Sequence, residues 1–283
     1  MKAMLNTIIH LVDLSDIEYE NTYGKLNEYI SSKLKRLPKR YRHFLGQPFN
    51  EVLNNIYRDI IELTNLYMIG KYKSVDRYRV CVKILKSFEE VISLSYTYWN
   101  LSGNQQNGIK YINKRVRIFW TDFINKEIAL ITGVMNKCNA DKKIVVDIPI
   151  MKPHTKSEIN DVIFLEKLST LQRIIYKRAI HTSKDFHDAR MEMLVSLSRS
   201  ALYNALQGND IFVDGNEKLY NKRKKFMSNA IGDLYAMNRP IKELGFNDIF
   251  SEDELESICN LLTECIKILK SVQETDGSIF NSR

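Results

Sequence analysis

Apolar residues recur at intervals of three and four positions along four successive segments of the first half of the chain. This spacing places them on one face of a helix, and it predicts four amphipathic helices. Turn-rich breaks separate the segments at Leu37-Pro38 and at residues 70–74 and 102–108. Short connections between long helices make neighbours antiparallel, so we expect an up-down four-helix bundle over residues 17–136. The four apolar stripes are Tyr23, Leu26, Ile30, Leu34; Phe49, Val52, Ile56, Ile60, Leu63, Tyr67; Tyr78, Val82, Leu85, Phe88, Ile92; and Ile109, Ile112, Val116, Phe119, Phe123.

The same periodicity returns in the second half of the chain. The sequence Ser251-Glu252-Asp253-Glu254 has the pattern of a capping box and predicts where the last helix begins. We therefore expect an all-α fold of eight principal helices in two tandem up-down four-helix bundles, the second over residues 157–283. Its four stripes are Phe164, Leu168, Leu171, Ile175; Leu194, Leu197, Ala201, Ala205; Phe226, Ala230, Leu234, Met237, Ile241; and Leu255, Ile258, Leu262, Leu269.

Two segments fall outside the helical pattern. Residues 137–156 contain Pro149 and Pro153 and predict a linker, within which residues 144–148 have the composition of a short strand. Residues 1–16 are apolar but interrupted by polar side chains, and we interpret them as an N-terminal docking segment rather than a signal peptide. No stretch approaches the roughly 20 apolar residues of a membrane span, so we expect a soluble protein without a membrane partner.

Positive charge is concentrated in the first half of the chain. Residues 1–140 carry 21 Lys and Arg against 13 Asp and Glu, whereas residues 141–283 carry 21 of each. A concentrated positive field attracts polyanions, which favours nucleic acid as a partner of the first half. The alternative is a surface whose charge serves only solubility. The four cysteines form no CxxC pair, which predicts reduced core thiols and a cytoplasmic location.

The candidate nucleic-acid-binding residues form one cluster at the first helix junction and two helical stripes. Like charges at such spacing repel one another, and a bound polyanion would relieve that repulsion. Tyr41, Tyr72 and Tyr111 lie among these charges, where they either stack on bases or pack against the protein. The candidates are Lys33, Lys35, Arg36, Lys39, Arg40 and Arg42 at the junction, Arg79, Lys83 and Lys86 on one stripe, and Lys110, Lys114 and Arg117 on the other.

The sequence contains no recognisable catalytic or metal-binding motif. It has no GxxxxGK[ST] phosphate loop, GxGxxG, GxSxG or HExxH, and no His has a Glu three residues before it. We therefore expect neither enzymatic activity nor a cofactor or metal. One pattern keeps an alternative open, because Arg36 and His43 have the spacing of the Arg and His in HEPN ribonucleases. Pro38 lies between them and disfavours the shared helix geometry of such a site.

Residues 23–67 and 76–135 carry a resemblance to a known family. The carrying features are a first helix that ends in Leu37-Pro38-Lys39-Arg40, an aromatic-Leu-Gly step at Phe44-Leu45-Gly46, a long second helix and two basic helices, the last ending near Gly133. With these features the segment resembles the accessory variability determinant (Avd) proteins of diversity-generating retroelements. It is also similar to the wider four-helix-bundle family that includes proteins encoded in ribosomal-RNA intervening sequences.

The resemblance implies a basic, barrel-like homopentamer without enzymatic activity. In that family the protein partners a reverse transcriptase and its template RNA in mutagenic complementary-DNA synthesis. This chain departs from the pattern in two ways: Pro48 must kink or delay the second helix, and the second bundle about doubles the length. Two other functions stay open, a helical ribonuclease or toxin centred on Arg36 and His43, and a plain protein-interaction scaffold.

Overall fold

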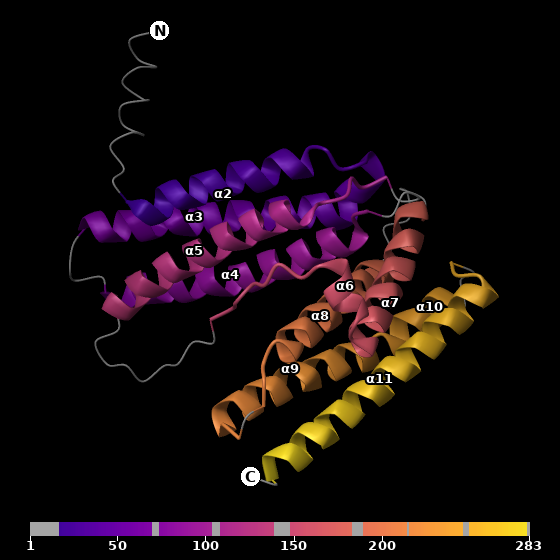
Figure 1. Cartoon of the computed structure of the whole chain (residues 1–283). Coiled ribbons are helices and arrows are strands. Elements are labelled where there is room, and N and C mark those ends of the chain that lie inside the picture. The colour runs from indigo at the N-terminus through magenta and orange to yellow at the C-terminus, as the bar shows by residue number, and fades with distance from the viewer. Residues whose placement is uncertain are drawn as a thin grey trace. The chain divides into compact units, whose positions relative to one another are not determined.

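The computed structural model describes residues 17–69, 74–103, 108–138, 148–182, 189–213, 215–245 and 249–281. These residues are mainly helical and include no strand (Figure 1). The prediction of an all-α fold is therefore confirmed. Eight helices in the described ranges are 17 to 30 residues long: α2 (Glu18–Leu34), α3 (Gln47–Ile69), α4 (Ser74–Leu101), α5 (Lys114–Cys138), α7 (Ile163–His181), α8 (Ala189–Asn209), α9 (Glu217–Ala236) and α11 (Glu252–Asn281). The shorter elements are η1 (Lys39–Tyr41), η2 (Arg42–Gly46), α6 (Lys156–Asn160) and α10 (Asn238–Gly245).

The chain forms two compact units that cut across the predicted domain boundaries. Unit 1 comprises Met1–Leu37, Gly46–Ile92 and Asn113–Pro153; unit 2 comprises Pro38–Leu45, Ser93–Ile112 and His154–Arg283. Helix α4 therefore contributes its first part to unit 1 and its last part to unit 2. The prediction of two separate bundles in tandem is not confirmed, because segments assigned to the first bundle belong to the second unit.

The core of unit 1 is built by α2, α3, α5 and the first part of α4. All four predicted stripe residues of α2 are buried, and the Tyr23 hydroxyl donates a hydrogen bond to the carbonyl oxygen of Leu53 at 2.5 Å. The rings of Phe49 and Trp120 lie 6.0 Å apart in the same core. Tyr67 is an exception to the predicted α3 stripe, since it is 58% exposed near the end of that helix. Figure 1 shows α2, α3 and α5 running alongside one another.

Helix α5 buries a different face from the one predicted. Its core positions are occupied by Arg117, Trp120, Ile124, Ile128 and Ile131, whereas Phe119 is 47% exposed. The predicted stripe was wrong because it began at Ile109 and Ile112, which are buried but precede the helix start at Lys114. A stripe whose first members lie outside the helix assigns the wrong phase to all later members.

Pro48 lies in the first turn of α3, which begins at Gln47. A proline is tolerated there because the first N–H groups of a helix have no intrahelical acceptor. The expectation that Pro48 delays the helix start is consistent with this position. Unit 1 also holds the predicted linker as far as Pro153, and there the backbone of Met151 exchanges two hydrogen bonds with the Asn125 side chain, at 2.8 and 3.0 Å.

Unit 2 is centred on four long helices. Helix α8 packs against α7 and α9, and α11 also contacts both of those helices. At the start of α11, the Glu254 carboxylate accepts a hydrogen bond from the Ser251 N–H at 3.1 Å. The Glu254 N–H donates to Oγ of Ser251 at 3.3 Å, which confirms the capping box. The predicted third helix is instead divided into two helices, α9 and α10. Met237 lies between them, and Pro240 lies in the first turn of α10.

Some of the predicted segments lie outside the described residues. The docking segment at 1–16, Tyr72 and residues 144–147 of the short-strand prediction are outside the described ranges. Cys81, Cys138 and Cys265 are buried free thiols, but Cys259 is exposed. Within the described residues, no helix is long and apolar enough to cross a membrane.

Candidate nucleic-acid interface

The structure places most of the predicted basic residues at the surface and divides them between the two units. Lys33 is half-buried, and Arg117 is 3% exposed on the core face of α5, so Arg117 is removed from the set of surface contacts. The exposed members in unit 1 are Lys35, Arg36, Arg79, Lys83, Lys86 and Lys114; those in unit 2 are Lys39, Arg40, Arg42 and Lys110.

In unit 2 a short irregular turn assembles a group that we call the junction cluster, Lys39, Arg40, Arg42 and Lys110. Pro38 is extended, with ψ 145°, and its carbonyl accepts the Tyr41 N–H at 2.9 Å to begin η1. Tyr41 is fully buried, and burial raises the pKa of its hydroxyl to about 12. This aromatic anchor keeps its charged neighbours in the chain at the surface.

The junction cluster gathers residues that are far apart in the sequence. A terminal nitrogen of Arg40 lies 3.2 Å from the position that a Cβ on Gly108 would occupy, and the Pro38 ring lies 3.7 Å from it. Gly108 has a φ of +69°, a left-handed conformation that favours glycine. Lys110, two residues on, therefore lies on the segment that passes beside Arg40.

Next to the junction cluster, Tyr111 packs on a glycine. Gly103 has a φ of +83°, and a Cβ on it would lie only 2.6 Å from Cδ2 of the Tyr111 ring. The Gly103 N–H also donates to the carbonyl of Ile109 at 3.4 Å. The ring is nevertheless 64% exposed, so one part of it contacts backbone while the rest faces solvent. A residue with a side chain at 103 would displace this ring.

Unit 1 presents a second basic and aromatic group, the α2–α5 cluster, made of Tyr29, Lys33 and Phe119 with Lys35, Arg36 and Lys114 near them in sequence. The Lys33 Nζ lies 5.0 Å above the Tyr29 ring, and that ring contacts Phe119 edge-on at 4.9 Å. These contacts bring the end of α2 to the start of α5. Tyr29 was not among the predicted residues, although its position four before Lys33 on the same helix face was a usable signal.

The predicted stripe on α4 is largely ion-paired. Lys83 contacts the nearly buried carboxylate of Asp59 at 2.6 Å, and this hydrogen bond raises the pKa of Lys83. Arg79 lies 3.7 Å from Asp76. Lys86 is exposed and forms no ion pair within the described ranges. The stripe therefore offers a phosphate less unpaired charge than its sequence indicates.

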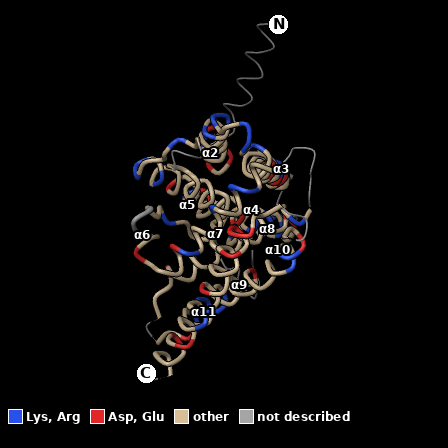
Figure 2. Tube along the Cα trace, turned by 90° about the vertical axis from the view of Figure 1, so that its right-hand side faces the viewer, with Lys and Arg blue, Asp and Glu red and all other residues tan. Residues whose placement is uncertain are grey.

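The two residues of the ribonuclease alternative lie on different elements. Arg36 follows the end of α2 in unit 1, whereas His43 belongs to η2 and pairs with Glu192 of α8 at 3.4 Å in unit 2. No group of three or more His, Cys, Asp or Glu able to hold a metal occurs in the part of the chain that the structure describes. Acidic residues are interspersed with Lys and Arg on many helices (Figure 2).

Comparison with known proteins found no relative of this chain. The sequence matches no protein-family model and no curated protein, and the structure matches no solved structure.

Proposed function

We propose that this protein is a non-catalytic accessory that binds single-stranded nucleic acid through the junction cluster and Tyr111. The observation that carries the proposal is the exposed Tyr111 ring, which packs on Gly103 and directly follows Lys110 on the segment whose Gly108 lies beside Arg40. An aromatic ring beside cations is the usual combination for single strands, since bases stack on the ring and phosphates contact the charges. Backbone packing fixes the ring in advance and so lowers the entropy cost of stacking.

The proposed partners are a reverse transcriptase and its template RNA in a diversity-generating retroelement. This part of the proposal is supported by the resemblance of residues 23–67 and 76–135 to the accessory variability determinant proteins. The α2–α5 cluster supplies a second basic and aromatic surface that is suited to the same polyanion. Co-purification of native complexes, with identification of the bound RNA and protein together, tests the partners directly.

Replacing Tyr111 by Ala is expected to weaken single-strand binding about 5- to 150-fold, because stacking contributes about 1–3 kcal/mol per base. Tyr111→Phe keeps the ring and is expected to bind like the original protein. Fluorescence anisotropy with a labelled oligoribonucleotide measures both. If Tyr111→Ala binds as tightly as Tyr111→Phe, bases do not stack on this ring.

Replacing Lys39, Arg40, Arg42 and Lys110 together by Gln is expected to flatten the salt dependence of binding. Each lost phosphate contact lowers the log-log slope by about 0.7 for a single strand, so the slope decreases by up to roughly three units. The matched control replaces four exposed lysines elsewhere, Lys137, Lys177, Lys218 and Lys242. Equal changes in both variants would show that net charge, rather than this cluster, attracts the nucleic acid.

We also propose that the protein is a homo-oligomer, with five copies as the expected number from the resemblance. A ring would repeat each basic cluster and increase the affinity for a long polyanion through avidity. Multi-angle light scattering at micromolar concentration and moderate salt is expected to give the mass of five 33.1 kDa chains. A strict monomer under these conditions contradicts the proposal.

Two measurements separate the alternative functions. A helical ribonuclease would cleave the oligoribonucleotide and lose that activity in His43→Ala, whereas the accessory leaves the RNA intact. A plain protein-interaction scaffold would show neither cleavage nor salt-dependent RNA binding.

A further inference from the structure

A cavity in unit 2 is unrelated to the basic clusters. It is a shallow hollow that is widely open to solvent, and its volume of about 560 Å³ is within the range of roughly 300–1,000 Å³ that small-molecule sites occupy. Helix α11 forms most of its wall, and α7 and α9 contribute one residue each. Ile268 and Val272 give the wall an apolar part, and the polar lining includes Lys167, Arg223, Glu264, Lys267 and Asp276.

The lining of this cavity contains three cationic side chains but only two carboxylates. Lys167 pairs with Glu264 at 2.5 Å, and Arg223 pairs with Asp276 at 2.6 Å. Each of the two carboxylates thus has its own cation. Lys267, the third cation, is exposed and pairs with no carboxylate in the described ranges. One net positive charge in the lining matches a ligand with a single negative charge.

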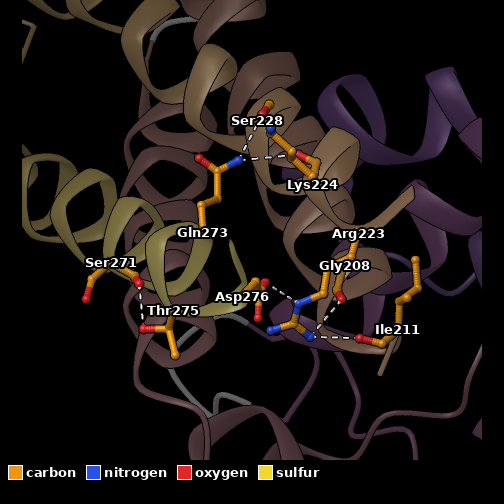
Figure 3. Close-up of polar contacts among 9 residues, drawn as sticks. All are labelled: Gly208, Ile211, Arg223, Lys224, Ser228, Ser271, Gln273, Thr275 and Asp276. Carbon is orange, nitrogen blue, oxygen red and sulfur yellow. Dashed lines mark hydrogen bonds and ion pairs between the residues drawn. The ribbon is translucent and has the colours of Figure 1, made fainter. Parts of the chain in front are cut away.

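Arg223 is held rigidly at the wall of the cavity. Its Nε donates to Asp276, and its Nη1 donates to the carbonyl oxygens of Gly208 at 3.3 Å and Ile211 at 2.8 Å (Figure 3). The second terminal nitrogen, Nη2, makes none of these bonds and keeps its donors available. This fixed guanidinium and its partner carboxylate form a rigid polar edge of the cavity.

We infer that this cavity binds a small monocarboxylate with an apolar tail. The carboxylate contacts the Lys267 ammonium, and the tail packs on Ile268 and Val272. This site uses none of the residues of the junction cluster, so it is independent of the proposed nucleic-acid binding.

Octanoate and the uncharged octanol are suitable probes for the full-length protein in isothermal titration calorimetry. Octanoate is expected to bind saturably and more tightly than octanol. Lys267→Gln is expected to weaken octanoate binding about three- to fivefold, as loss of one exposed ion pair predicts, and to leave octanol unchanged. The matched control is Lys270→Gln, an exposed lysine on the same helix that does not line the cavity.

Val272→Trp fills the cavity and is expected to abolish binding of both probes. Circular dichroism checks that this variant is folded; if it is not, the comparison of Lys267→Gln with Lys270→Gln decides alone. The inference is overturned if the original protein shows no saturable octanoate binding, if both lysine variants lose affinity equally, or if folded Val272→Trp binds octanoate unchanged.

Discussion

The unfolding free energy of this protein is expected to fall as the pH rises from about 4.5 to about 9, and replacing Glu127 by Gln is expected to remove that decrease. Glu127 lies on the core face of α5 with 0% of its surface exposed. Neither carboxyl oxygen has a hydrogen-bond partner within the described ranges. Burial raises the pKa of this carboxyl to about 9, with a smaller opposing effect from Lys126.

The direction of the effect follows from the protons bound in each state. In the unfolded chain Glu127 releases its proton near pH 4.5, whereas in the folded protein it keeps the proton up to about pH 9. Between these values the unfolded state binds fewer protons, so raising the pH favours unfolding by about 1.4 kcal/mol per pH unit. The contribution is fully present below pH 4.5 and is lost by about pH 9.

Urea unfolding of the original protein and Glu127→Gln across this range measures the difference. Between pH 5 and pH 8, the unfolding free energy of Glu127→Gln is expected to increase by roughly 4 kcal/mol relative to that of the original protein. Glu28→Gln, at an exposed position on α2, is the control and is expected to show no comparable shift. A pH-independent gap for Glu127→Gln would mean that this carboxyl is ionised in the folded protein.

Replacing Arg223 by Met is expected to destabilise the protein by about 3–5 kcal/mol, since it leaves the carboxylate of Asp276 buried without its cation. The change also removes two donors from the carbonyl groups of Gly208 and Ile211, at and just after the end of α8. Thermal or urea unfolding measures the loss.

A double-mutant cycle separates the ion pair from the capping bonds. Asp276→Leu combined with Arg223→Met removes both charges, and it is expected to cost less than the sum of the two single changes by about 1–3 kcal/mol. Lys225→Met, on the same helix, is the control at an exposed position. Strict additivity would show that Arg223 acts only through the two carbonyl groups.

The local features of the sequence predicted local structure well. Apolar spacing identified the helices because an amphipathic helix must bury one face whatever it packs against. The Ser251–Glu254 box predicted its helix start because all its partners lie within one turn. Arg117 and Phe119, two residues apart on α5, show the limit of this reasoning. Arg117 was expected at the surface and is buried, whereas Phe119 was expected in the core and is exposed.

The helical class, most helix positions and the basic character of the first half could be predicted from the sequence alone. Which basic side chains lack an acidic partner depends on the packing of the helices, because Asp59 and Lys83 are 24 residues apart and meet only when α3 and α4 pack. The same holds for Tyr111 on Gly103 and for Arg223 with Asp276. Periodicity specifies which face of one helix is apolar, but pairing across helices depends on the phase and register with which the helices meet.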